Sequence, residues 1–385
     1  MTSEYDFNTP IDRRGTSSFK WDKYKDRDVI PMWVADMDFR SPPAVIEALH
    51  QRVDHGVFGY GDAPCELNDI IVSMLQSDYG WAIDSSWIVW LPGLVTGLNV
   101  TCRAIGDDGS DVLTNTPAYP PFLSAPDNSR RNLVSVPLVR EDDRWNFDFD
   151  RIEKAITPQT RLFILCNPHN PTGRVFTRDE LVELCRICER HDIVICSDEI
   201  HCGLILDTDK THIPTATLSS DIADRTITLM APSKTYNLPG LGCSFAIISN
   251  DDIRWSFRKA MSGIVPHVNV LGFTASLAAY RDSHDWQLAL LYYLRTNRDI
   301  LEKSIQGIDG LTMTHVEATY LAWIDTRQAG MEKPVRFLEE AGVGLSDGAY
   351  FGDPGFVRLN FGCPRTILEE ALRCIRTAME HLGKQ

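Results

Sequence analysis

Between residues 87 and 249 the chain alternates short apolar runs with segments of helix length. A continuous apolar run is typical of a strand that is covered on both faces, and the segments between such runs predict crossover helices. We therefore expect a mainly parallel, doubly wound sheet whose ligands bind beyond the carboxyl ends of the strands. The seven expected strands cover residues 87–91, 111–115, 134–139, 161–166, 193–197, 226–230 and 243–249.

The pattern changes after this core. Residues 284–306 and 365–382 predict amphipathic helices, and residues 318–324 and 356–360 predict strands between them. Together they indicate a small α/β domain, which the N-terminal segment completes. We therefore divide the chain into an N-terminal segment, 1–48, a large domain, 49–283, and a small C-terminal domain, 284–385. A chain of 385 residues is long enough for two cores of this kind.

Composition excludes several classes of function. The formal net charge of −15 disfavours a nucleic-acid partner, because phosphates would be repelled. The first 14 residues are polar, unlike a signal peptide, and no apolar run reaches membrane-spanning length, so we expect a cytoplasmic protein without membrane contact. Ten cysteines fit a reducing compartment. Cys185 and Cys188 have C-x-x-C spacing, but they fall in a helical pattern where a buried core position is favoured over a zinc or redox site. No metal site is expected.

Polar residues follow the expected strands one after another. Gly93, Leu94 and Val95 form a glycine turn that enters a helix, where free N–H groups would hold a phosphate. The later loops contain Tyr119, the stretch N-P-H-N-P-T-G at 167–173, S-D-E-I-H at 197–201 and S-K-T at 233–235. Each one alone can be explained as a turn, a cap or a solvated lysine. Their order along the chain is not explained in that way.

This series resembles the fold-type I pyridoxal-phosphate enzymes of the class I/II aminotransferase family, and the similarity covers nearly the whole chain. It implies an aspartate-aminotransferase-like fold, with a large cofactor-binding domain around a mainly parallel seven-stranded sheet and a small α/β domain. Residues 32–39 (M-W-V-A-D-M-D-F), 197–201 and 317–325 (E-A-T-Y-L-A-W-I-D) are similar to one branch of this family, the cystathionine β-lyase-type C–S lyases.

The resemblance implies a role for each loop residue. Lys234 would bind pyridoxal 5'-phosphate covalently and move the substrate Cα proton as general base. Asp198 would pair with the ring nitrogen, and Asn170 would bond the phenolic oxygen of the ring. Tyr119 would stack on the ring. His201 stands where many aminotransferases have a tyrosine, and its contact with the ring stays open.

Substrate and phosphate contacts follow from the same resemblance. Arg358 would take the substrate carboxylate through a bidentate fork, with Ala35 and Asn170 beside it. Gly93, Leu94, Val95 and Ser233 would bind the phosphate. The family often has a serine three residues before the lysine and an arginine eight residues after it, but this chain has Ala231 and Gly242 there. Tyr60 resembles the tyrosine that reaches the neighbouring subunit's phosphate, which implies a homodimer with shared active sites.

Two reactions stay open. After loss of the Cα proton, elimination at Cβ would make the chain a C–S β-lyase that converts cystathionine or a related cysteine S-conjugate to a thiol, pyruvate and ammonia. Reprotonation on the cofactor would make it an aminotransferase of small amino acids. The branch resemblance favours the lyase, and Tyr60, Tyr119 and Lys234 are candidate proton donors to a departing thiolate. A regulatory protein with a relic site is a third possibility, against which the intact polar set argues. Trp33 and Tyr320 are further candidates for the pocket wall.

Overall fold

The computed structural model of the protein describes residues 5–382. Its centre is a seven-stranded sheet in the order β2-β10-β9-β8-β7-β3-β4. Neighbouring strands from β9 to β4 run parallel, and β10 runs antiparallel to both β2 and β9. The expected mainly parallel sheet is confirmed. Its strands are β2 (Ile88–Leu91), β3 (Asp111–Thr116), β4 (Asn132–Pro137), β7 (Thr160–Cys166), β8 (Val194–Asp198), β9 (Thr226–Met230) and β10 (Ser244–Ile247).

Helices cover both faces of this sheet, which is why its inner strands are almost entirely buried, whereas the edge strand β4 is mostly exposed. Along β7, Leu162 and Ile164 pack into one core with α4 (Leu94–Ala104), α5 (Pro120–Asn128) and α9 (Asp251–Met261). The intervening Phe163 and Leu165 pack into the opposite core. That core is closed by α6 (Phe149–Ala155), α7 (Arg178–Arg190) and α8 (Ser220–Asp224). The alternation is the two-residue period of a strand.

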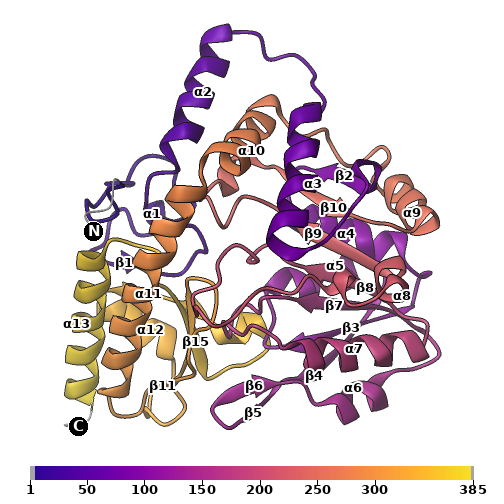
Figure 1. Ribbon diagram of the computed structural model, residues 1–385. Helices are drawn as coiled ribbons and strands as arrows, with labels where there is room; N and C mark the ends of the chain where they lie inside the picture. Colours follow the sequence, from indigo (N-terminus) through magenta and orange to yellow (C-terminus); the bar gives the residue numbers. More distant parts are fainter. Residues whose placement is uncertain (1–4, 383–385) are drawn as a thin grey trace.

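A smaller sheet lies beside the large one, in the order β11-β12-β15-β14. Its strands are β11 (Thr312–Met313), β12 (Leu321–Asp325), β14 (Ser346–Asp347) and β15 (Phe356–Asn360). The helices α11 (His284–Gln306) and α13 (Arg365–Leu382) lie side by side against it (Figure 1). The N-terminal segment joins this part, because β1 (Ile30–Pro31) pairs in parallel with β13 (Val343–Gly344). The domain boundaries given above stay a prediction.

The remaining elements complete the chain. A short hairpin precedes α6, and α2 projects from one end of the molecule (Figure 1). Cys185 and Cys188 are buried in α7, and in the described part of the chain no group of three or more His, Cys, Asp or Glu is arranged to hold a metal ion. No helix within residues 5–382 is both long and apolar enough to cross a bilayer. The further elements are α1 (Phe19–Asp22), α2 (Pro43–His55), α3 (Cys65–Tyr79), β5 (Val139–Glu141), β6 (Arg144–Asn146), α10 (Val270–Asp282) and α12 (Pro334–Glu340).

Candidate active site

A cavity of about 1150 Å³ opens beyond the carboxyl ends of the central strands, between the large sheet and the C-terminal part. This is the position that a doubly wound sheet predicts for a ligand. Eleven of the twelve site residues expected from the sequence line it: Ala35, Gly93, Leu94, Val95, Tyr119, Asn170, Asp198, His201, Ser233, Lys234 and Arg358. Tyr60 is the exception.

Lys234 follows β9 and is directed into the cavity. Its Nζ donates a hydrogen bond to the carbonyl oxygen of Ala35 at 2.6 Å. Burial, with the nearby charge of Arg358, lowers the pKa of this amine to about 8. A substantial fraction of the amine is therefore neutral near physiological pH, and a neutral amine is what a nucleophile or a general base requires.

Asp198 ends β8 and is also buried. Its Oδ1 accepts a hydrogen bond from the backbone N–H of Ile200 at 3.1 Å, and burial raises the pKa of the carboxyl to about 7. Within residues 5–382 no cation lies at ion-pair distance from this carboxylate. A buried acid of this kind is suited to pair with a cationic group of a ligand. Behind it, Glu199 accepts hydrogen bonds from Ser197 Oγ and the Thr215 N–H and pairs with His212 Nε2.

Arg358 projects from the middle of β15. Its guanidinium donates to Asn170 Oδ1 at 3.1 Å and to the Trp33 carbonyl at 3.0 Å, and it lies 4.7 Å from the ring centroid of Phe351. Burial lowers its pKa to about 10. No carboxylate of the described chain pairs with it, and its Nε is buried without a hydrogen-bond partner. Such a guanidinium can take a carboxylate from a small ligand.

The first turn of α4 supplies the anion-binding end of the cavity. Gly93 is the N-cap and provides no side-chain cap, so the N–H groups of Leu94 and Val95 have no intrahelical acceptor. These donors and the helix dipole favour a phosphate or another anion. Ala231 and Gly242 also line the cavity, and neither offers a polar side chain there. Ser233 is the hydroxyl that the nearby loop contributes.

Tyr119 and His201 occupy the remaining wall. Tyr119 lies at the N-terminus of α5, with its ring edge against Phe122 at a centroid distance of 6.4 Å, and burial raises its pKa. The His201 ring stands against Tyr320 at 6.4 Å. Burial holds the pKa of His201 well below its ordinary value, so the imidazole is neutral, and its Nδ1 is buried without a partner.

Tyr60 lies outside this cavity. It sits in the loop between α2 and α3, and its side chain is fully exposed. The single chain therefore leaves this tyrosine away from its own Lys234. The expectation that Tyr60 serves a neighbouring subunit stays a prediction.

Comparison with known proteins agrees with this geometry. A family model described as "Aminotransferase class I and II" matches residues 27–375. The chain belongs to this family. Cystathionine beta-lyase PatB of Bacillus subtilis (strain 168) is 37% identical, over 97% of this chain and 99% of the relative.

Solved structures show that the similarity to other proteins includes the fold. The crystal structure of OvoB superposes with a TM-score of 0.95 at 46% identity, covering 97% of this chain and 99% of that one. The PLP-bound C–S lyase from Staphylococcus hominis superposes with a TM-score of 0.92 at 32% identity, covering 98% of this chain and 99% of that one. The expected family and fold type are thereby confirmed.

Several residues at or behind the cavity wall of this aminotransferase class I and II member were not expected from the sequence. Asn360 lies behind the wall, two residues after Arg358 on β15, and its amide donates to the carbonyls of Val34 and Asp36. The two-residue period of a strand places both side chains on one face and could have indicated it. Ser346 and Phe19 line the cavity. They belong to the short elements β14 and α1, which carry no comparable pattern in the sequence.

Proposed function

We propose that this protein is a pyridoxal-phosphate-dependent C–S β-lyase. It would convert L-cystathionine or a related cysteine S-conjugate, with water, to a thiol, pyruvate and ammonia. The near-full-length similarity to PatB supports the reaction class. The observation that carries the proposal is the joint placement of Lys234, Asp198 and Arg358 around one cavity. Asp198 and Arg358 are buried and Lys234 is partly buried, and none of them has an opposite charge at ion-pair distance in the described chain.

The cavity fits pyridoxal phosphate at each functional group. The first turn of α4 and Ser233 would hold the phosphate, and the buried carboxylate of Asp198 would pair with the ring nitrogen. Asn170 would bond the phenolic oxygen, Tyr119 and His201 would flank the ring, and Lys234 would bind it covalently. Bound pyridoxal phosphate supplies an electron-withdrawing ring that stabilises negative charge at the substrate Cα.

The amino-acid end of the substrate would be oriented by Arg358. Its two Nη atoms offer a planar fork for the α-carboxylate, with Asn170 and the Ala35 backbone beside it. This would hold the Cα–H bond next to the Lys234 amine. Burial lowers the pKa of that amine to about 8, so it can accept the Cα proton near neutral pH. Lys234 and Tyr119 would then return a proton to the departing sulfur.

We also propose a cytoplasmic homodimer with shared active sites. Tyr60, Phe58, Val57 and Val53 form an exposed, largely apolar stretch at the end of α2 and in the loop after it. Exposed apolar clusters of this kind are typical of an interface, and a second subunit would bring Tyr60 to the phosphate end of the neighbouring cavity. The cytoplasmic location is supported by the ten cysteines, all free thiols.

The test is a coupled assay on the purified holoenzyme. L-Cystathionine is added with lactate dehydrogenase and NADH, and the visible spectrum is recorded. We expect a cofactor band near ~420 nm and steady pyruvate release, both lost in Lys234→Ala and both retained in the exposed control Lys303→Ala. Turnover only when a keto acid is supplied would make the protein an aminotransferase. Absence of the band with added pyridoxal phosphate would contradict the cofactor assignment.

A further inference from the structure

Residues 33–38 follow β1 without regular secondary structure, and side chains hold their backbone. Ala35 is the centre of this segment, because its carbonyl oxygen accepts hydrogen bonds from Lys234 Nζ at 2.6 Å and from the Tyr320 hydroxyl at 2.9 Å. The neighbouring carbonyl oxygens also accept hydrogen bonds from side chains. Ser346 and Arg358 donate to the carbonyl of Trp33, and Asn360 donates to those of Val34 and Asp36. Asn237 and Arg13 donate to the carbonyl of Met37. The acceptor of the Lys234 amine is therefore fixed by contacts beyond the cavity itself.

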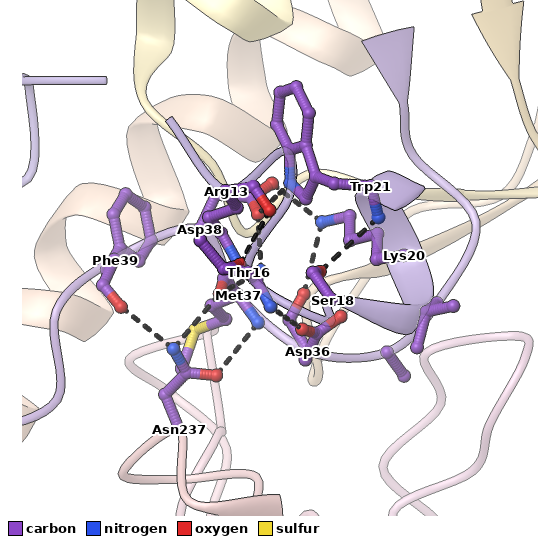
Figure 2. A network of polar contacts seen from close by, with 12 residues as sticks. Arg13, Thr16, Ser18, Lys20, Trp21, Asp36, Met37, Asp38, Phe39 and Asn237 are labelled. Carbon is purple, nitrogen blue, oxygen red and sulfur yellow. Dashed lines mark hydrogen bonds and ion pairs between the residues drawn. The ribbon is translucent and has the colours of Figure 1, made fainter. Parts of the chain in front are cut away.

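A partly buried ionic group, here named the Asp38 cluster, lies against this segment and consists of Arg13, Lys20, Trp21, Asp36 and Asp38 (Figure 2). Lys20 Nζ donates to Asp38 Oδ2 at 2.7 Å and to the Asp36 carbonyl at 3.2 Å. Asp38 Oδ1 accepts from Trp21 Nε1 at 2.8 Å and from Arg13 Nη1 at 2.6 Å. A second nitrogen of Arg13 pairs with the Asp36 carboxylate at 2.6 Å.

The burial of Lys20 and Asp38 within this cluster is unusual for charged side chains. Lys20 is 1% exposed and Asp38 is 2% exposed. Two carboxylates face two cations, so the cluster is neutral as a whole. Replacement of such a group by apolar residues is often neutral or stabilising, because the desolvation of the charges offsets most of their attraction. The distinctive effect of the cluster is then to fix the geometry of the chain around it.

The Asp38 cluster reaches the cavity through two routes. Lys20 and Arg13 hold the carbonyl and the carboxylate of Asp36, the residue that follows Ala35. Lys20 also belongs to the short helix α1, whose Phe19 lines the cavity and packs on Trp33 at a ring distance of 5.0 Å. The Trp33 indole donates in turn to the Lys20 carbonyl at 3.1 Å. A displacement of Lys20 would therefore move both the Ala35 peptide and the cavity wall.

We propose that Lys20 and Asp38 are positioning residues for Lys234: through the Asp36 backbone and α1 they hold the Ala35 carbonyl where it orients the lysine amine. This inference rests on the proposed function only in taking Lys234 as the reacting amine. Neither Lys20 nor Asp38 lines the cavity, so both act through the peptide segment and not by contact with a ligand.

The test uses Lys20→Met and Asp38→Asn, which keep the size of each side chain and remove its charge. Lys25→Met is the matched control, because Lys25 is an exposed lysine of the same N-terminal segment. In the protein freed of cofactor, acylation of the Lys234 amine is followed against pH by mass spectrometry of its peptide. In the holoenzyme, kcat and KM for pyruvate release are measured.

We expect the midpoint of Lys234 acylation to move up toward the value of an ordinary lysine in both variants, since a loosened Ala35 segment admits water. We expect kcat to fall about tenfold to 100-fold and KM to stay within about threefold, because misplacement of the base affects the chemical step more than binding. Lys25→Met should match the wild type in both measurements.

A purely structural role would lower the melting temperature of Lys20→Met and leave the acylation midpoint and kcat unchanged, which would overturn the proposal. If Lys20→Met and Asp38→Asn do not fold, Arg13→Gln replaces them, since Arg13 is partly exposed. A smaller shift in the same direction would support the proposal, and no shift would overturn it. Failure of the lyase assignment is separable: the wild type would release no pyruvate, while the acylation profiles would still decide the role of Lys20 and Asp38.

Discussion

Burial sets the chemistry of single residues in this cavity. Asp198 is buried and Lys234 partly buried, and their pKa values move toward each other, to about 7 and about 8. Arg358 is buried as well, without a carboxylate of the described chain at ion-pair distance. Groups in this state are costly to a folded protein unless a ligand compensates them. The ionisation of these residues therefore affects the stability of the cofactor-free protein.

The burial of the Asp198 carboxylate predicts that the stability of the protein depends on pH. Burial raises its folded pKa from 3.8 to about 7, so the folded state holds the proton longer than the unfolded state and stability falls as pH rises through this range. We expect Asp198→Asn, free of cofactor, to have a higher free energy of unfolding in urea than the wild type. The difference should grow by about 2–3 kcal/mol from pH 4.5 to 7.5. A difference that does not change with pH would contradict the raised pKa of Asp198.

Arg358 predicts a binding effect. Lysine in its place would keep the positive charge and lose the planar fork, so we expect Arg358→Lys to raise KM for the amino-acid substrate about tenfold to 100-fold. Arg373→Lys, on the exposed face of α13, is the control and should leave KM unchanged. Steady-state kinetics of pyruvate release measure both. An unchanged KM in Arg358→Lys would remove this residue from the carboxylate site.

At the scale of elements, the phosphate end depends on how closely α4 packs on the sheet. Gly97 allows this approach, because a Cβ at its position would come within 3.1 Å of side-chain atoms of Leu91 and Leu229. Both leucines are fully buried, so they have little freedom to move. The position of the first turn of α4, with its free N–H groups, is thus set by a residue one turn away.

We expect Gly97→Val to push α4 from β2 and β9, to destabilise the protein by about 1–3 kcal/mol and to weaken cofactor binding. Thermal unfolding and a fluorescence titration with pyridoxal phosphate measure the two effects. Gly240→Ala is the control, because a Cβ there meets no atom within 4 Å. Equal behaviour of the two variants would show that the close approach of α4 is unimportant.

At the scale of the whole molecule, the exposed Tyr60 and its apolar neighbours lie outside the chain's own cavity. The proposed homodimer would give this stretch a partner and complete each site from two chains. Measurements on single variants do not test this arrangement, because a loss of activity does not show which subunit supplies the missing group.

Mixing two variants tests it. Tyr60→Ala and Lys234→Ala should each have little activity, and an equal mixture after subunit exchange should regain about a quarter of the wild-type rate. Half of the dimers are then hybrids, and each hybrid has one cavity with both Lys234 and the neighbour's Tyr60. A mixture no more active than the sum of its parts would contradict shared active sites. Analytical ultracentrifugation gives the oligomeric state independently.

The sequence by itself determined the large sheet and the family. The strands are continuous apolar runs because both faces are covered, so their positions can be read without any tertiary information. The loop residues from Gly93 to Lys234 could be expected at one edge, because parallel strands end there together. Arg358 was expected from the family resemblance, since its distance along the chain gives no local sign of the cavity.

Only the tertiary structure decided how the N-terminal segment contributes to the cavity. Lys20 and Asp38 have no periodic pattern that marks them as buried, and a charged side chain is ordinarily exposed. Their burial follows from contacts between residues far apart in the chain, with Asn237, Ser346 and Asn360 all binding the same six-residue segment. Local sequence specifies which elements form. The partners of a buried charge depend on how those elements meet, and that is a property of the folded molecule.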